Sequence, residues 1–170
     1  WCIVGHWPVT LYHPHVPSAA PLLAEGRHIA SIDGGCSLKV DGQLNALVLP
    51  ERPGGAFSWF AYDGLPTAEA LDPQAPSADS VNIRWGRNAL EVLERGAELS
   101  LCRHLETGRV LEVLTEYLYV DRGVTRCEDS TDYRLAVRPG DTLSVVRRIS
   151  DRALVKKDGV TGWYFGRLAH

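Results

Sequence analysis

The 170-residue sequence predicts a mostly β protein, and three observations support this. Short runs rich in Ile, Val and Leu occupy residues 2–4, 29–32 and 44–49. Each run is followed by Gly, Asp or Pro, and runs of this length are typical of buried strands. From residue 80 onward, apolar and polar residues alternate between turn signals, which is the pattern of hairpin strands. Part of this second region is also repeated.

The composition limits the class of protein. With 45% hydrophobic residues the chain can bury a core, and no apolar run approaches the ~20 residues of a membrane span. A net charge of -3 without a basic block argues against nucleic acid and anionic membranes as partners. Cys2, Cys36, Cys102 and Cys127 lack the spacing of a zinc knuckle or a thioredoxin-type motif. We therefore expect free thiols and a cytoplasmic location.

Composition shifts divide the chain into four segments. Residues 1–50 contain the first three apolar runs, and residues 51–79 combine proline turns with an aromatic cluster. We expect this cluster to form one strand that packs on a neighbouring domain, with the rest of 51–79 as a connector. Residues 80–120 and 121–170 are predicted as two small β units. The aromatic cluster consists of Phe57, Trp59, Phe60 and Tyr62.

The two β units share an order of elements, which predicts a duplication. Residues 90–93, 99–104 and 107–109 match residues 143–146, 153–158 and 161–163 in the same order. The second copy resembles an SH3-type barrel over residues 131–170, and the first matches more loosely over 81–119. The paired tryptophans that peptide-binding SH3 domains carry are replaced by Lys156 and Lys157. We therefore predict packing roles for Trp163 and Tyr164, and a solvent-facing hairpin for the two lysines.

The pentapeptide from Val4 to Pro8 contains the strongest candidate for chemistry, His6. An apolar strand that runs into Gly-His places an imidazole at a strand end, where α/β sheets have their sites. Gly5 permits a sharp turn of the backbone there. A neutral imidazole is a good ligand for Mn, Fe or Zn, while a simple packing role beside Trp7 stays open.

Three sequence blocks, at residues 5–9, 29–36 and 42–47, carry a family resemblance. In this order they resemble the closing part of a calcineurin-like metallophosphoesterase, of the serine/threonine phosphoprotein phosphatase and diadenosine tetraphosphatase branch. The resemblance implies the last strands of an α/β sandwich, whose enzyme hydrolyses phosphate esters with a hydroxide activated by two metal ions. His6 would be a ligand of one of two divalent ions, manganese first, with iron or zinc as alternatives. Gly34, Gly35 and Cys36 would line the substrate rim.

The other ligand blocks of that family are Asp-x-His, Gly-Asp-x-x-Asp and Gly-Asn-His-[Glu/Asp], and none occurs in this sequence. No catalytic residue is therefore assigned within the chain. The sequence begins at Trp1 and contains no Met, so we expect the C-terminal part of a longer phosphohydrolase, inactive by itself. Its substrate would be a phosphoprotein or a small phosphate ester, and the SH3-like tail would pack on the catalytic domain. The alternative is a non-catalytic SH3-like binding or regulatory module.

Two further groups of polar residues are candidates for metal binding, with structural roles as the alternative. His13 and His15 are alternate residues and would share one face of an extended segment. Residues 129–132 form an acidic stretch that suits a turn or, as the alternative, an acidic metal loop.

Overall fold

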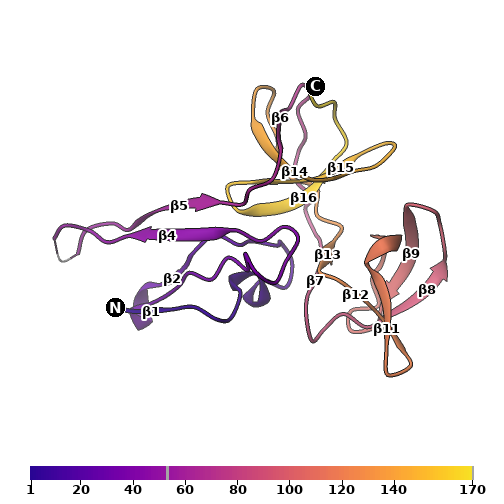
Figure 1. Ribbon diagram of the computed structural model, residues 1–170, viewed down its shortest axis with the longest axis horizontal. Helices are drawn as coiled ribbons and strands as arrows, with labels where there is room; N and C mark the ends of the chain where they lie inside the picture. Colours follow the sequence, from indigo (N-terminus) through magenta and orange to yellow (C-terminus); the bar gives the residue numbers. More distant parts are fainter. Residues whose placement is uncertain (53, 170) are drawn as a thin grey trace.

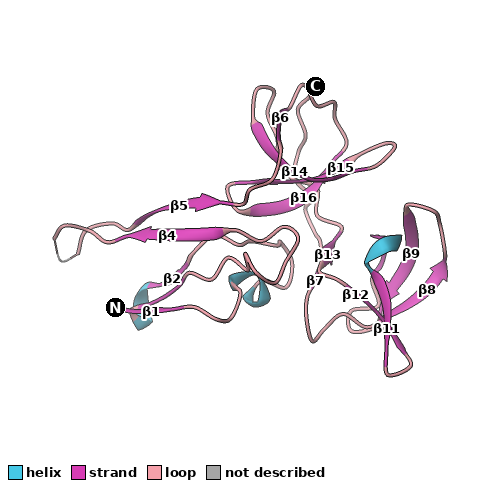
Figure 2. Ribbon diagram, in the orientation of Figure 1, coloured by secondary structure: helices cyan, strands magenta, loops and turns pink. Residues whose placement is uncertain are grey.

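The computed structural model describes residues 1–52 and 54–169, and this part of the chain is mostly β, as predicted. Its sixteen strands form six small sheets, accompanied by three short 3-10 helices (Figure 2). None of these sheets closes into a barrel within the described residues. The SH3-like barrels and the α/β sandwich therefore stay predictions. In the same residues, no helix has the length and apolar character needed to cross a lipid bilayer.

The N-terminal sheet has the order β1-β3-β2, formed by β1 (Cys2–Val4), β2 (Leu22–Ala24) and β3 (Ile29–Ser31). Strand β1 is parallel to β3, and β2 is antiparallel to β3. The short helices η1 (Val9–Tyr12) and η2 (Glu25–Arg27) lie between the strands. The predicted strand at residues 2–4 is confirmed, but its predicted burial is wrong. All three β1 residues are exposed, because none of the described segments covers them.

Strands β4 (Leu44–Val48) and β5 (Ser58–Tyr62) form an antiparallel ribbon, the long arm at the left of Figure 1. Three members of the aromatic cluster lie in β5, as predicted, and Phe57 directly precedes it. However, the side chains of Phe60 and Tyr62 are 70% and 74% exposed, so the expected packing on a neighbour is wrong for these two residues.

The first β unit has its own apolar core and runs through eight short elements as far as Thr131, beyond the predicted boundary at residue 120. These are β7 (Asn82–Ile83), β8 (Leu90–Glu94), β9 (Leu99–His104), β10 (Val110–Leu114), η3 (Thr115–Tyr117), β11 (Leu118–Asp121), β12 (Val124–Cys127) and β13 (Ser130–Thr131). Strands β8, β9 and β10 form an antiparallel meander, β11 pairs with β12, and β7 pairs with β13. The buried core includes Ile83, Leu90, Cys102, Val113 and Cys127.

The second β unit is a four-stranded antiparallel sheet with the order β16-β15-β14-β6. Its strands are β6 (Thr67–Glu69), β14 (Thr142–Arg148), β15 (Ala153–Lys157) and β16 (Val160–Tyr164). Strand β6 comes from the segment predicted as a connector and pairs along β14. The core of this unit includes Leu135, Val137, Leu143, Val155 and Tyr164.

The duplication is visible in the register of the two meanders. In β8 a bulge falls between Val92 and Glu94, and in β14 a bulge falls between Val145 and Arg147. Val92 pairs with Cys102, and Val145 pairs with Val155, so both pairs correspond at a constant spacing of 53 residues. A bulge is an extra residue that bends a strand at a defined place, and here both copies carry it at the same position.

The predicted alignment of residues 107–109 with residues 161–163 is wrong. Thr107 and Gly108 lie in the loop that joins β9 to β10, whereas Thr161 and Gly162 lie within β16. The loop between β9 and β10 is longer than the loop between β15 and β16. The third strands therefore correspond through Leu111, which pairs with Cys102, and Gly162, which pairs with Val155.

Candidate functional site

His6 lies just beyond the C-terminal end of β1 and is exposed. Its φ angle is 74°, in the left-handed region that residues other than glycine rarely adopt. The sharp turn predicted at Gly5 therefore falls on His6 itself. Immediately afterwards the chain is buried at Pro8 and Val9, and the Val9 N–H donates to the Asp33 carbonyl at 2.8 Å. The strand end and this bond hold the imidazole at the surface.

The predicted rim follows the neighbouring strand, β3. Because β1 and β3 are parallel, with Val4 paired to Ser31, their C-terminal ends meet at one edge of the sheet. The Ile32 N–H donates to the Val4 carbonyl at 3.0 Å, directly before the rim begins. Ligands of open sheets bind outside the C-terminal ends of parallel strands. The structure thus brings His6 and residues 34–36 to the same edge.

Glycine is required at two rim positions. A Cβ atom on Gly34 would overlap the carbonyl oxygen of Gln43, because the two backbones touch there. Gly35 has a φ angle of 74° and donates its N–H to the Asp33 carboxylate at 2.8 Å. Gly34 and Gly35 are buried, while Cys36 is exposed. The rim is therefore a tight turn with a thiol on its solvent side.

Two buried amide side chains, Gln43 and Asn45, support the rim from behind. The Asn45 amide donates to the carbonyls of Ala19 at 2.8 Å and Ile32 at 3.0 Å, and its oxygen accepts from Gln43 at 2.6 Å. Both residues belong to a block that carries the family resemblance, but the sequence assigned them no role. Buried amides without a partner are costly, so this pairing holds the segments together.

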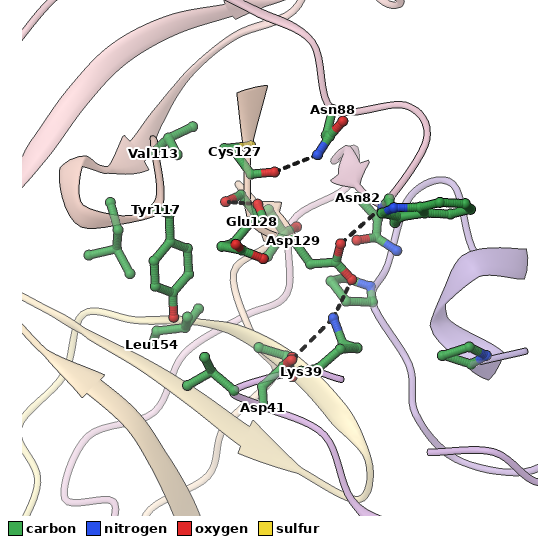
Figure 3. Close-up of a pocket in the computed structure, with 18 of the residues that line it drawn as sticks. Lys39, Asp41, Asn82, Asn88, Val113, Tyr117, Cys127, Glu128, Asp129 and Leu154 are labelled. Carbon is green, nitrogen blue, oxygen red and sulfur yellow. Dashed lines mark hydrogen bonds and ion pairs between the residues drawn. The ribbon is translucent and has the colours of Figure 1, made fainter. Parts of the chain in front are cut away.

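A buried ion network ties the loop that follows the rim to both β units. Lys39 pairs with Asp41 at 3.2 Å and with Asp129, which precedes β13 (Figure 3). Burial acts to lower the pKa of Lys39, but the two carboxylates outweigh it and the pKa is raised. Burial acts to raise the pKa of Asp41, but Lys39 and a hydrogen bond from Thr161 outweigh it and the pKa is lowered. Both shifts favour the charged forms of Lys39 and Asp41.

Lys156 corrects a prediction from the sequence. It was expected on the solvent face of a hairpin, yet the residue is only 2% exposed. Its ammonium donates to the Asp41 carbonyl at 2.8 Å and lies 3.7 Å from the Asp63 carboxylate. Burial lowers the pKa of Lys156. The loop of residues 38–41 covers the hairpin face that the alternation assigned to solvent.

The remaining sequence candidates have structural contacts. His15 hydrogen-bonds through Nδ1 to the Ser80 carbonyl at 3.1 Å, and burial lowers the pKa of His13. Asp132 accepts from the Val81 N–H at 2.8 Å and pairs with Arg109. These contacts link the loop after η1 and the stretch before β14 to the start of the first β unit.

The described residues do not by themselves fit a two-metal centre. Within them, no group of three or more His, Cys, Asp or Glu side chains lies close enough to hold a metal ion. A pair of ions needs about four or more protein ligands. The edge formed by β1 and β3 offers one exposed imidazole, His6, which is the contribution that the sequence predicted from this chain.

A cavity of about 410 Å³ opens beside His6 and extends between the N-terminal segment and both β units. Its walls come from residues 6–8, 38–41, 112–114 and 127–131, and from Leu154 and Trp163 at the far side. Sequence reasoning missed this cavity, because its walls come from residues more than a hundred positions apart and carry no local motif.

No protein-family model, curated protein or solved structure matches this chain. Function is therefore inferred from the residues of the chain and their geometry.

Proposed function

We propose that this chain is part of a metal-dependent phosphohydrolase, in which His6 is one ligand of a pair of divalent ions. Residues 34–36 would form the rim of the site, and the N-terminal strands would belong to its α/β sandwich. The other ligands would come from residues outside these 170. The substrate would be a phosphoprotein or a small phosphate ester.

The observation that carries this proposal is the parallel pairing of β1 with β3. Val4 pairs with Ser31, 27 positions later in the sequence, so the first two blocks of the family resemblance follow strands that end at the same sheet edge.

The test is His6→Asn in the protein that carries the remaining ligand blocks. Asparagine tolerates a left-handed backbone, so the substitution removes the imidazole without adding strain. We expect turnover of a phosphate monoester in the presence of Mn to fall roughly 100-fold or more, and bound metal to fall with it.

The matched control is His28→Asn. His28 is also exposed and also has a positive φ angle, 53°, but it precedes β3, at the opposite end of that strand from the rim. Activity should be unchanged in this variant. Full activity in His6→Asn would refute the proposed role of His6.

A second candidate function, a non-catalytic binding module, is supported by the cavity between the β units. Recognition of a peptide by the predicted SH3-like aromatics has less support. Trp163 is 5% exposed and donates to the Thr131 carbonyl at 2.8 Å, and Tyr164 is fully buried. Their predicted packing roles are confirmed.

A further inference from the structure

The cavity beside His6 has the size of a small-molecule site. Its volume of about 410 Å³ lies within the range of roughly 300–1,000 Å³ typical of ligand pockets. Apolar side chains such as Leu38, Tyr117 and Leu154 form much of its wall (Figure 3). A solvent-connected apolar cavity of this size can bury the body of an organic ligand.

The indole rings of Trp7 and Trp85 form an exposed part of the cavity wall. The rings of Trp7 and Trp85 lie 5.9 Å apart with an interplanar angle of 79°, so they form a corner. Trp7 is 44% exposed and Trp85 67% exposed. Indole faces attract cations through the ring quadrupole more strongly than the rings of Tyr or Phe, and an ammonium group can lie against the parts of these faces that the edge-to-face contact leaves open.

The charges around the cavity also favour a cation. Four carboxylates line it, those of Asp41, Glu112, Glu128 and Asp129. The cations that neutralise them are Lys39 between Asp41 and Asp129, Lys156 beside Asp41, and Arg152, which pairs with Glu112 at 2.7 Å.

Lys156 also lies 3.7 Å from the Asp63 carboxylate and Arg152 also pairs with Asp151, so these two cations share their charge with carboxylates outside the wall. Within the described residues the Glu128 carboxylate has no ion pair, and the carboxylate of Asp129 next to it accepts from the backbone N–H of Trp85 at 3.1 Å. The cavity wall therefore carries a carboxylate, that of Glu128, with no ion pair among the described residues.

The same arrangement disfavours an anion inside the cavity. The Lys39 ammonium, the one lysine in the wall, is held between two carboxylates. A phosphate placed there would meet net negative charge in a partly desolvated space, where repulsion is strong.

We propose that this cavity binds a small organic cation, whose ammonium group lies against Trp7 and Trp85 beside Glu128 and whose apolar part lies between Leu38, Tyr117 and Leu154. The cavity adjoins His6, the proposed metal ligand, but binding of the cation needs no metal and no residue outside the 170.

The test titrates the 170-residue chain with three probes that share a benzene ring. They are the cation benzyltrimethylammonium, the neutral benzyl alcohol and the anion phenyl phosphate. Binding is measured by calorimetry and by the NMR signals of the tryptophan indole N–H groups. We expect the cation to bind with a dissociation constant of about 1 mM or lower, at least about tenfold more tightly than the other probes. The signals of Trp7 and Trp85 should shift on binding.

Two variants locate the site. Trp85→Leu should weaken binding of the cation about tenfold, and Glu128→Gln about threefold. Both residues are exposed, so the fold should persist. The matched controls are Trp1→Leu, an indole 51% exposed outside the cavity, and Glu94→Gln, an exposed carboxylate on β8. Neither control should change the affinity.

Three outcomes would overturn the proposal. They are no saturable binding of the cation up to about 10 mM, equal or tighter binding of phenyl phosphate, and unchanged affinity in both Trp85→Leu and Glu128→Gln. Loss of metal-dependent activity in His6→Asn bears on the hydrolase alone, so the two proposals can fail separately.

Discussion

The two meanders have the same register and bulge but differ in what covers them. On the inner face the copies agree, since Cys102 and Val155 occupy corresponding positions and both are fully buried. On the outer face they differ. Leu101 is 37% exposed, while the corresponding Leu154 is 6% exposed. Arg103 is exposed and pairs with Glu91, while the corresponding Lys156 is buried.

The difference follows from contacts with the rest of the chain. In the second copy, Leu154 packs with Leu114 of the first β unit and with Trp163, and the loop of residues 38–41 covers Lys156. In the first copy, the outer face carries ion pairs with solvent-exposed partners. One strand pattern thus gives a surface in one copy and an interface in the other.

The largest effect should come from shortening the leucines at the corresponding outer positions. Leu154→Ala should lower the free energy of unfolding by about 3 kcal/mol, because it leaves a hole in a buried cluster. Leu101→Ala should cost about 1 kcal/mol, since that side chain is partly exposed. Urea unfolding followed by circular dichroism measures both values. Equal losses would show that the outer faces are not different environments.

A smaller contrast should separate the two cations. Lys156→Ala should lower the free energy of unfolding by about 2 kcal/mol, because the Asp41 carbonyl and the Asp63 carboxylate lose a buried partner. Arg103→Ala removes an exposed ion pair and should cost less than about 0.5 kcal/mol. The same urea titration measures both variants, and a loss in Arg103→Ala as large as in Lys156→Ala would contradict this account.

The smallest effect should appear only in acid. The pKa of Asp41 is lowered in the folded protein, so its contribution to stability is present above the ordinary aspartate pKa of 3.8. This contribution is lost as the pH falls below that value toward the lowered pKa. In Asp41→Asn the free energy of unfolding should therefore fall less, by about 1 kcal/mol, as the pH drops below 3.8. Asp158→Asn, at an exposed turn, is the control, and parallel curves for Asp41→Asn and the unmodified chain would refute the role of Asp41.

Local patterns predicted β1, β3 and β4 of the N-terminal segment but not β2, and they predicted the aromatic strand β5 and most of the repeat. These features depend on neighbours along the chain, because alternation and turn residues act over a few positions. The third block of the repeat was misplaced, because Thr-Gly suits both a hairpin loop and a strand, and the lengths of the two hairpin loops differ.

In the candidate site, too, the sequence identified residues that lie in local motifs and missed those that do not. His6 and Gly34 were identified from motifs, and the structure brings both to one sheet edge. The ion network of Lys39, Asp41 and Lys156 was not identified, because its members are isolated charges in the sequence. Nothing local distinguishes a lysine that will be covered from one that will face solvent.

The sequence by itself determined most of the strands, the alternation of side chains along each of them, and that an imidazole follows the first strand, but it missed β2 and β6. Only the tertiary structure decided which of those sides are covered, and with them the burial of Lys156 and the cavity between Trp7, Trp85 and Leu154. The physical reason is the range of the interactions. Side-chain alternation is set by the backbone of a single strand, whereas burial requires a second surface that the chain supplies from far away.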